Sequence, residues 1–565
     1  MRRPDRSPAP ARLTAGERPP YGRGRSEPRL PAWVRDLCAP RAYAHRPPSV
    51  ELVQTHISYV FLAGEFVYKA KKPVDFGFIE QLSLETRERF CREEVRVNER
   101  LAPGVYLGVV PIVMHPQGRH VVDPREHGLS ASAGTVVEWA VKMRRLPDER
   151  TLDRLLASGA ADAAAAELLA RTLLRFHRAA ARAPGGPDFA GVRAERSWWE
   201  RERDEARVHI GETWEPADAS LTMSFIDETL EREGTLFDER AAAGRVVEGH
   251  GDLQARHIYL LPGPDGGEPR VLAVDGIEFS EGYRFRYLDV GYDLAFPAMD
   301  LEALGHGALG DELVGRYIAG SGDEALGVLQ PLHRCQRAFV RGKVESLGAR
   351  AREIPPVARE RLRASAARYF ALAAEYARRR APPVLVLLCG LPGSGKSVLG
   401  GTLAGRLGCA YLSSDATRRE LASLAAGRRV PAGSGLYGRE MTERTYGELR
   451  RRAAAHLRSG RPVVVDATHA SAAHRAAARR VAEEEAAPFL TVELRLSEQA
   501  ALGRIAARRS DSLRVSDADE AVYRLQRERF EPPAADEGPR LLLDAGGPPG
   551  ALAAAVAEEL TRRGR

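Results

Sequence analysis

The sequence has 565 residues, of which 28% are charged and 44% hydrophobic, and its formal net charge is +7 at pH 7. One hydrophobic core rarely serves a chain of this length, so we expect about two to four domains. Residues 1–30 hold eight Arg and three acidic residues, a net +5 that leaves only +2 for the other 535 residues. The basic balance is therefore a property of the N-terminal segment and is weak evidence for a nucleic-acid-binding surface.

Two further features of the composition exclude classes of protein. No run approaches the roughly 18 apolar residues that a membrane-spanning helix needs, so we expect no membrane insertion. The five Cys are isolated, odd in number and form no Cys-x-x-Cys pair. This pattern argues against structural zinc and fits a reducing compartment, so we expect a soluble, cytoplasmic protein.

The N-terminal half begins with residues 1–48, which contain ten Pro and show neither helix nor strand periodicity. We predict that they form a disordered basic leader, and they lack the apolar core of a signal peptide. The elements expected next are strands at 58–61, 65–69, 105–113 and 135–143, helices at 84–101, 160–181 and 197–233, short strands at 246–247, 257–261 and 271–274, and helices from 292 to about 380.

A break at Ala381-Pro382-Pro383 ends the charged helical segment and opens a region where strands and helices alternate. Alternation of this kind implies a parallel sheet with helices on both faces. The strands expected here are 384–389, 410–412, 462–465, 489–496 and 541–543. We therefore divide the chain into the leader at 1–48, an α+β domain at 49–350, a helical linker at 351–382 and an α/β domain at 383–565.

A phosphate-binding loop follows the first strand of the α/β domain, where residues 390–397 read Gly-Leu-Pro-Gly-Ser-Gly-Lys-Ser. A Gly-rich turn between a strand and a helix points backbone N–H groups and the positive helix end at a polyphosphate. Lys396 is expected to reach the β- and γ-phosphates of ATP and Ser397 to bind Mg²⁺. The residues expected to hold the nucleotide are Gly390, Gly393, Ser394, Gly395, Lys396 and Ser397.

Acidic and basic residues near other strand ends suggest which reaction this loop serves. Asp466 ends the strand Pro-Val-Val-Val-Asp, where it is expected to hold Mg²⁺, unless it only caps the following turn. Asp415 follows the second strand, and on a helix Arg418 would lie one turn above it, beside the substrate. The alternative is an N-cap Asp with a solvated Arg. Arg504 and Arg508 lie four residues apart on a predicted helix and are candidate lid cations, although basic residues on a helix are often simply solvated.

Residues 383–563 resemble the small P-loop kinases related to polynucleotide kinase, gluconate kinase and zeta-toxin-like enzymes. The motifs that carry the resemblance are the phosphate loop, Ser-Ser-Asp-Ala-Thr-Arg at 413–418 and Val-Val-Val-Asp-Ala-Thr-His at 463–469. The resemblance implies that Asp415 accepts the proton of a substrate hydroxyl, that Arg418 binds the acceptor or a phosphate, and that Arg504 or Arg508 acts as a lid cation.

Two motifs in the N-terminal half resemble aminoglycoside-phosphotransferase-like kinases, over about residues 49–350. They read His-Gly-Asp-Leu-Gln-Ala-Arg-His-Ile at 250–258 and Val-Leu-Ala-Val-Asp-Gly-Ile-Glu-Phe at 271–279. The resemblance implies that Asp252 orients or deprotonates an acceptor hydroxyl and that Asp275 binds the Mg²⁺ of ATP. It also implies a bilobal, protein-kinase-like fold with an interlobe hinge at 139–147.

The same resemblance assigns a Lys on the third strand to ATP and a helical Glu to that Lys. Lys69 is the first candidate, and Lys71 competes because period-two alternation puts both on one face. Glu94 is the expected ion-pair partner, with Glu93 as the alternative.

One position departs from the family pattern, because His257 stands where the family carries a metal-binding Asn. Mg²⁺ prefers hard oxygen ligands, so His257 either weakens the second metal site or has another role. We expect Asp289 and Asp293 to brace the catalytic loop. Asp300 and Glu302 lie near the helical region, but they do not form the acidic cluster that an aminoglycoside pocket would carry.

The whole chain thus resembles bacterial proteins described as bifunctional aminoglycoside phosphotransferase/ATP-binding proteins or AAA-family ATPases. The expected function is ATP- and Mg²⁺-dependent phosphotransfer to a hydroxyl of a small molecule, with two candidate nucleotide sites. Two alternatives remain: an N-terminal pseudokinase that regulates one active P-loop kinase, or a nucleic-acid 5′-hydroxyl kinase assisted by the basic leader. Nucleic acid is the less favoured partner, since the charge excess lies in residues 1–30.

Overall fold

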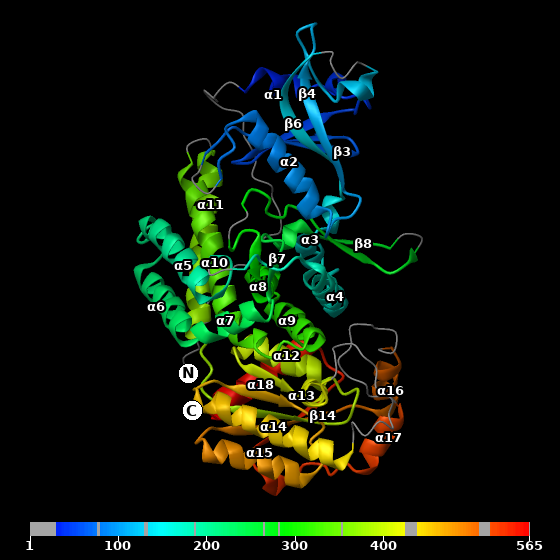
Figure 1. The fold of residues 1–565 in the computed structure, drawn as a ribbon, viewed down its shortest axis with the longest axis vertical. Helices are drawn as coiled ribbons and strands as arrows, with labels where there is room; N and C mark the ends of the chain where they lie inside the picture. The colour runs from blue at the N-terminus through cyan, green and yellow to red at the C-terminus, as the bar shows by residue number, and fades with distance from the viewer. Residues whose placement is uncertain are drawn as a thin grey trace, which may run out of the picture.

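The computed structural model describes residues 30–75, 79–128, 134–185, 188–263, 266–280, 283–351, 354–423, 438–507 and 520–563. It has three parts along its long axis: an N-terminal sheet, a helical body and a C-terminal sheet covered by helices (Figure 1). Within the described residues, no helix is long and apolar enough to cross a membrane.

The N-terminal sheet has six antiparallel strands in the order β1-β2-β3-β6-β4-β5. Apolar residues alternate along some of its inner strands and are continuous in others. One face of the sheet can therefore pack against the long helix α2. Ser83 caps that helix by accepting the backbone N–H of Thr86 at 3.0 Å. The elements are β1 (Val50–Gln54), β2 (Ser58–Ala63), β3 (Phe66–Lys71), α2 (Leu84–Asn98), β4 (Tyr106–Met114), β5 (His120–Val122) and β6 (Thr135–Arg144).

The predicted disordered leader is wrong for its last part. Residues 32–37 form helix α1 (Ala32–Leu37), and Val34 and Leu37 are fully buried against the outer face of the sheet. Tyr43 is also buried, and its ring lies 5.0 Å from that of Tyr68 in β3. The Pro-rich composition hid this short apolar helix, and residues 1–29 lie outside the described part of the chain.

The helical body packs around two long helices, α10 and α11, and also contains two small antiparallel sheets of two strands each. Its elements are α3 (Leu152–Ala157), α4 (Ala163–Ala179), α5 (Gly191–Ala206), α6 (Pro216–Arg232), α7 (Gly234–Ala242), β7 (Val246–Glu248), β8 (Ile258–Leu261), β9 (Arg270–Ala273), β10 (Tyr287–Asp289), α8 (Val290–Ala303), α9 (Gly307–Ser321), α10 (Leu326–Arg350) and α11 (Pro356–Arg378).

The segment predicted as a linker is an integral part of this body. Helix α11 packs along α10, and its residues Ala366, Phe370 and Ala373 are buried. The Phe370 ring stacks on Trp214, with 4.6 Å between ring centroids. A charged helix can look like a linker in sequence, because most of its residues lie on the polar face and only a narrow stripe is apolar.

The C-terminal sheet is parallel throughout, in the order β12-β13-β11-β14-β15, as the alternating pattern predicts. Strand β11 lies in its centre and is completely buried. The elements are β11 (Leu385–Cys389), α12 (Lys396–Leu407), β12 (Ala410–Ser413), α13 (Ser414–Leu421), α14 (Arg439–Arg458), β13 (Val463–Asp466), α15 (Ala472–Glu484), β14 (Phe489–Arg495), α16 (Glu498–Ala507), α17 (Glu520–Glu528), β15 (Arg540–Asp544) and α18 (Pro549–Arg563).

The two halves of the chain share one hydrophobic core, which runs from the helical body into the C-terminal sheet. At its centre α9 crosses α12 so closely that their backbones touch. A Cβ added at Gly315 would lie 2.1 Å from Thr402 Oγ1, and one added at Gly401 would lie 2.5 Å from the Gly315 carbonyl oxygen. The α/β domain is therefore built onto the helical body, with the helix of the phosphate loop between them (Figure 1).

We predict that Gly315→Ala destabilises the protein by about 1–3 kcal/mol, because the added methyl group meets the α12 backbone and forces the two helices apart. Urea denaturation measures the loss. The matched control is Gly503→Ala in α16, where an added Cβ meets nothing within 4 Å and should leave stability equal or slightly higher. Equal stability of the two variants would contradict the prediction.

Candidate functional site

The phosphate loop joins the end of β11 to α12 and has the backbone that its glycines predict. Gly390, Gly393 and Gly395 have φ values of 149°, 78° and 91°, where L side chains are strained. A Cβ at Gly393 would lie 2.6 Å from the Ala501 carbonyl oxygen, and one at Gly390 would lie 2.7 Å from that of Leu494. No other residue fits at these two positions without moving the neighbouring backbone.

Polar groups line this loop. Lys396 Nζ donates to the Leu391 carbonyl oxygen at 2.9 Å, which curls the ammonium group over the loop. The Ser394 hydroxyl is buried and has no hydrogen-bond partner among the described residues. A buried donor without a partner and a concave loop of glycines fit a polyphosphate, since its oxygens would accept from both groups.

Asp466 ends β13 beside the loop, where the sequence places it. Tyr411 donates its hydroxyl to Asp466 Oδ2 at 2.6 Å, and the Ser397 hydroxyl is hydrogen-bonded to the same carboxylate. Burial raises the pKa of Asp466, while the Lys396 ammonium group opposes the shift. A hydroxyl and a carboxylate oxygen form a hard donor set that suits Mg²⁺. Tyr411 was not singled out in the sequence, because nothing there shows that its ring crosses to β13.

Asp415 and Arg418 lie on the same rim of the sheet, in the first two turns of α13. Their side chains approach to 3.6 Å between Arg418 Nη1 and Asp415 Oδ1, as the predicted one-turn spacing requires. Ser413, and not Asp415, is the N-cap residue, because its hydroxyl accepts the Ala416 N–H. Asp415 is therefore not used as a cap.

Arg504 of α16 reaches the phosphate loop. Its Nη1 lies 3.4 Å from where a Cβ of Gly395 would be, and its Nη2 donates to the Ala545 carbonyl oxygen at 3.0 Å. A fixed guanidinium group is thus held beside the loop, as expected for a cation that faces phosphate. Arg508, the other candidate, lies outside the described residues.

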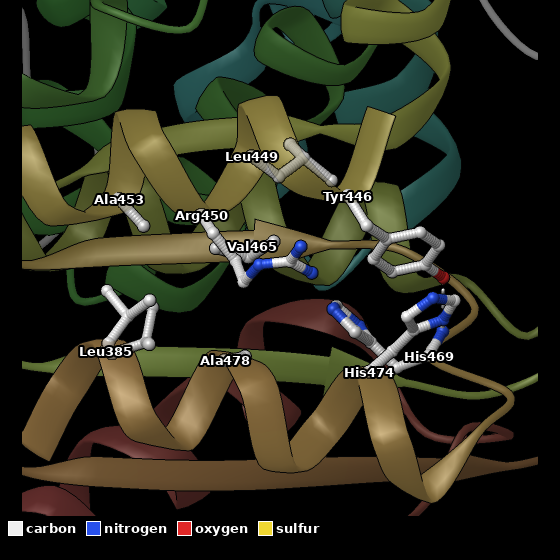
Figure 2. A pocket seen from close by; sticks show the side chains of 10 residues that line it. Leu385, Tyr446, Leu449, Arg450, Ala453, Val465, His469, His474 and Ala478 are labelled. Atoms are coloured by element: carbon white, nitrogen blue, oxygen red, sulfur yellow. Dashed lines mark hydrogen bonds between the residues drawn. The ribbon is translucent and has the colours of Figure 1, made fainter. Parts of the chain in front are cut away.

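His469 is a strained residue of this domain that the sequence did not identify as a candidate. Its φ is 43°, its Nδ1 lies 2.8 Å from the Leu388 carbonyl oxygen, and its backbone N–H donates to the Tyr446 hydroxyl. Burial lowers the pKa of His469 to about 3, so the ring is neutral. Figure 2 shows Tyr446 facing His469 and His474 at one end of a narrow apolar slot between α14 and α15, and the volume of this slot is about 10 Å³. The slot is too small for a substrate, and these rings fix the turn after Asp466.

A second cluster lies between the N-terminal sheet and the helical body. Lys69 Nζ is 2.9 Å from Glu94 Oε1 and 2.5 Å from Asp275 Oδ1, so the predicted ion pair with Glu94 forms. Lys71 is fully buried and pairs with Glu94 and Glu278. Burial opposes the charge of Lys69, but the two carboxylates raise its pKa well above the usual range. Lys69 is the Lys that faces Asp275.

Glu93, the alternative partner, is not part of this cluster. Its carboxylate pairs with Arg96 and Arg286 instead. Because Glu93 and Glu94 are adjacent on α2, they point about 100° apart, and only Glu94 faces the sheet.

The two acidic residues of the N-terminal motifs lie on either side of His257. Its Nδ1 is 3.3 Å from Asp252 Oδ2, and its Nε2 is 3.8 Å from Asp275 Oδ2. Gln254 Nε2 also donates to both carboxylate oxygens of Asp252, at 2.8 and 2.9 Å. Burial raises the pKa of Asp252, but His257 and Gln254 outweigh it and hold that pKa below the usual range.

The imidazole of His257 therefore occupies the position between the two carboxylates. Within the described ranges, no group of three His, Cys, Asp or Glu side chains is arranged to hold a metal ion alone. Asp275 has a φ of 66°, a strained left-handed conformation that aims its carboxylate at Lys69. The carboxylates fit Mg²⁺ only together with phosphate oxygens.

Asp293 braces the 250–251 loop as predicted, but Asp289 does not. Asp293 accepts the backbone N–H groups of His250 and Gly251 at 2.8 and 3.0 Å. Asp289 instead caps α8 and forms a bidentate pair with Arg240.

Asp300 and Glu302 both make structural contacts within the helical body. Asp300 accepts the Ala255 N–H at 2.8 Å and therefore braces the segment that follows the 250–251 loop. Glu302 accepts the Tyr376 hydroxyl at 2.6 Å and pairs with Arg379 of α11. Both carboxylates are thus used within the protein.

The fold and the phosphate loop define the C-terminal half as a P-loop nucleotide-binding domain, and residues 385–533 match the AAA domain family. Uncharacterized protein Rv2004c of Mycobacterium tuberculosis and uncharacterized protein Mb2027c of Mycobacterium bovis are each 33% identical to this chain over 463 residues. The matches cover 82% of this chain and 86% of each relative. The chain belongs to the same family as these mycobacterial proteins.

Solved structures also resemble part of the chain. A gluconokinase from Sinorhizobium meliloti is 21% identical, with 33% of this chain and 99% of that chain covered and a TM-score of 0.24. A sugar kinase from Janibacter sp. is 18% identical, with 31% and 92% covered and a TM-score of 0.25.

Substitutions of Lys69 and Lys71 should differ in their effects on the stability of the protein and on ATP binding. Lys71→Met leaves Glu94 and Glu278 buried with one cation fewer and should cost about 3–5 kcal/mol of stability. Lys69→Met leaves Glu94 paired with Lys71, so it should destabilise less and instead weaken binding of a fluorescent ATP analogue.

Both variants are made in a Lys396→Ala background, so that the C-terminal loop contributes little to the binding signal. Urea denaturation and fluorescence titration give the two readouts. If Lys69→Met is as destabilising as Lys71→Met and leaves binding intact, the assignment of Lys69 to ATP is wrong.

Proposed function

We propose that this protein is an ATP- and Mg²⁺-dependent phosphotransferase whose C-terminal site transfers the γ-phosphate to a hydroxyl of a small molecule. The observation that carries the proposal is the meeting of three strand ends. The phosphate loop follows β11, Asp466 ends β13, and Asp415 and Arg418 follow β12, all at the carboxyl edge of one parallel sheet. Ligands of open parallel sheets bind at this edge.

The residues of the loop have distinct roles in this proposal. Lys396 exchanges its bond to the Leu391 carbonyl for oxygens of the β- and γ-phosphates. Ser397 and Asp466 hold Mg²⁺, which when bound neutralises charge on the phosphates. Arg504, held at Gly395, faces the transferring group from the other side of the loop.

Asp415 and Arg418 define the acceptor side. The Asp415 side chain is 30% exposed and is not used as a cap, so its carboxylate can accept the proton of an incoming hydroxyl. Arg418 has a buried side chain and holds its guanidinium group beside that carboxylate, where it orients the acceptor or its phosphate. Fixed placement of this kind supplies most of the catalysis in phosphoryl transfer.

We further propose that the N-terminal half is a bilobal, protein-kinase-like domain with a second nucleotide site. The supporting observation is the pairing of Lys69 with both Glu94 and Asp275, across the junction of sheet and helical body. Asp252 lies on the adjacent loop, where it would orient an acceptor hydroxyl. If His257 blocks the metal, the domain acts instead as a pseudokinase that binds ligand and regulates the P-loop site.

A labelling experiment tests the C-terminal site. The purified protein is incubated with γ-labelled ATP and Mg²⁺, with either a small-metabolite extract or 5′-hydroxyl oligonucleotides. Label in a small molecule supports the proposal. Label only in oligonucleotides would favour the nucleic-acid kinase, and would show a steep salt dependence if the basic leader assists.

Within that assay, Asp415→Asn should lower kcat by about 10²–10⁴-fold and leave the KM for ATP nearly unchanged, because the base is lost and the phosphate loop is not. Lys396→Ala should remove transfer by weakening ATP binding and transition-state stabilisation together. Retention of full transfer by Lys396→Ala would contradict the proposed function.

Asp252→Asn tests the N-terminal centre. If that centre transfers phosphate, the variant should lose a subset of labelled products, while those that depend on Lys396 remain. The shape of the residue is kept, so its hydrogen bond from Gln254 can persist and folding should be unaffected. An unchanged set of products and unchanged ATP turnover would leave the pseudokinase as the function of this half.

A further inference from the structure

Glu324 belongs to the loop between α9 and α10, yet its polar contacts are with the C-terminal sheet. Its backbone carbonyl accepts the Tyr411 N–H at 3.1 Å, and its carboxylate accepts the N–H of Ser413. Both donors belong to β12, the edge strand of the parallel sheet. The N-terminal half thus forms hydrogen bonds with part of the edge strand, on the side where no neighbouring strand lies.

The carboxylate of Glu324 also joins an ion-pair network. Its Oε2 lies 3.3 Å from Arg452 Nη1 of α14. The same guanidinium group is 2.7 Å from Glu420 of α13 and 2.8 Å from Glu448 of α14. Through Arg452, one carboxylate of the helical body is linked to both helices that follow β12.

These contacts fall where the acceptor side of the site begins. Ser413 is the last residue of β12 and the N-cap of α13, and it lies opposite Asp466 in the sheet register. Asp415 follows two residues later, in the first turn of α13. A hydrogen bond to Ser413 N–H therefore fixes the point from which the Asp415 side chain is directed.

We propose that Glu324 is a positioning residue of the C-terminal phosphotransfer site, which holds Asp415 and Arg418 toward the acceptor by fixing the end of β12 and the start of α13. This inference rests on the proposed function. It makes the N-terminal half part of the machinery of the P-loop site, because that half supplies the carboxylate. Among the described residues, the polar contacts of Glu324 are with Tyr411, Ser413 and Arg452 and not with Asp415, so it acts through the backbone.

The surroundings of Glu324 add a pH dependence. Burial raises the pKa of its carboxyl group to about 7, and Glu420 adds to the shift, while Arg452 and the Ser413 N–H oppose it. Of the charged groups around it, Arg452 is held by Glu420 and Glu448, and the adjacent Asp323 is held by Arg240. The pair with Arg452 is therefore mostly charged at pH 8 and weakens as Glu324 gains a proton around and below pH 7.

The effect on stability has the opposite sign. Because the pKa of this acid is raised on folding from a reference value of 4.5, its stabilising contribution is present at low pH and is lost as pH rises through about 7. The neutral isostere Glu324→Gln should thus be at least as stable as the wild type at pH 8. A loss of activity in that variant is then not a loss of folding.

The test compares Glu324→Gln with a matched control, Glu233→Gln. Glu233 is also buried in the helical body and also pairs across the junction, but with Arg461 just before β13 and not with a residue of β12 or α13. The assay is label transfer from γ-labelled ATP to the metabolite extract from pH 6 to 8.5, with ATP titrated at each pH. Amide hydrogen exchange of residues 411–421 reports how firmly β12 and α13 are held.

We expect Glu324→Gln to lower kcat by about tenfold at pH 8, since small displacements of reacting groups have large effects on rate. The KM for ATP should stay the same, exchange in 411–421 should rise, and the fall of wild-type activity below pH 7 should be absent. Glu324→Asp should recover part of the rate, and Glu233→Gln should keep the wild-type kcat and pH profile.

An unchanged kcat in Glu324→Gln, or an equal loss in Glu233→Gln, would overturn the positioning role. Either result can occur while Lys396→Ala still removes transfer, in which case only this inference fails. If Lys396→Ala retains transfer, the proposed function itself has failed.

Discussion

The close crossing of α9 and α12 is the constraint on which both halves of the protein depend. Gly315 and Gly401 let the two backbones touch, and Asp311 of α9 pairs with Arg406 of α12 at 2.7 Å beside that contact. Because α12 begins at the phosphate loop, the helical body determines where the loop lies relative to everything N-terminal. A side chain larger than hydrogen at either glycine would force the two helices apart and so shift the phosphate loop relative to the helical body.

The same layer of helices supports the second cluster. Asp293 of α8 holds the 250–251 loop, and His177 bonds both Asp293 at 3.2 Å and Tyr317 of α9 at 2.9 Å. Tyr317 lies two residues after Gly315, the contact point with α12. The 250–251 loop of one half and the phosphate loop of the other are therefore attached to opposite sides of α9, and neither can shift without repacking that helix.

The sequence predicted the structure well where a motif determines its own backbone conformation or where a hydrophobic periodicity extends over many residues. The phosphate loop, the parallel sheet and helix α2 follow from Gly spacing, strand alternation and an N-capping Ser, all of which are local. It failed where burial comes from a distant segment. Helix α1 lies in a Pro-rich stretch and is held by the sheet, α11 owes its burial to α10 and Trp214, and Glu324 looks like an ordinary loop acid until β12 is placed beside it.

In each cluster, acids that brace the backbone differ in exposure from one acid that we propose faces a ligand. Asp293 and Asp300 accept backbone N–H groups and are buried, whereas the Asp275 side chain is 48% exposed and that of Asp415 is 30% exposed. Backbone N–H groups that bond a carboxylate fix its direction and use part of its acceptor sites, so Asp293 and Asp300 are held as braces. Spacing alone assigns neither role, because Asp289 and Asp293 lie in the same motif and only Asp293 reaches the loop. Asp415 in one half and Asp275 in the other are thus more exposed than Asp466 and Asp252, the other candidate carboxylates of the two sites.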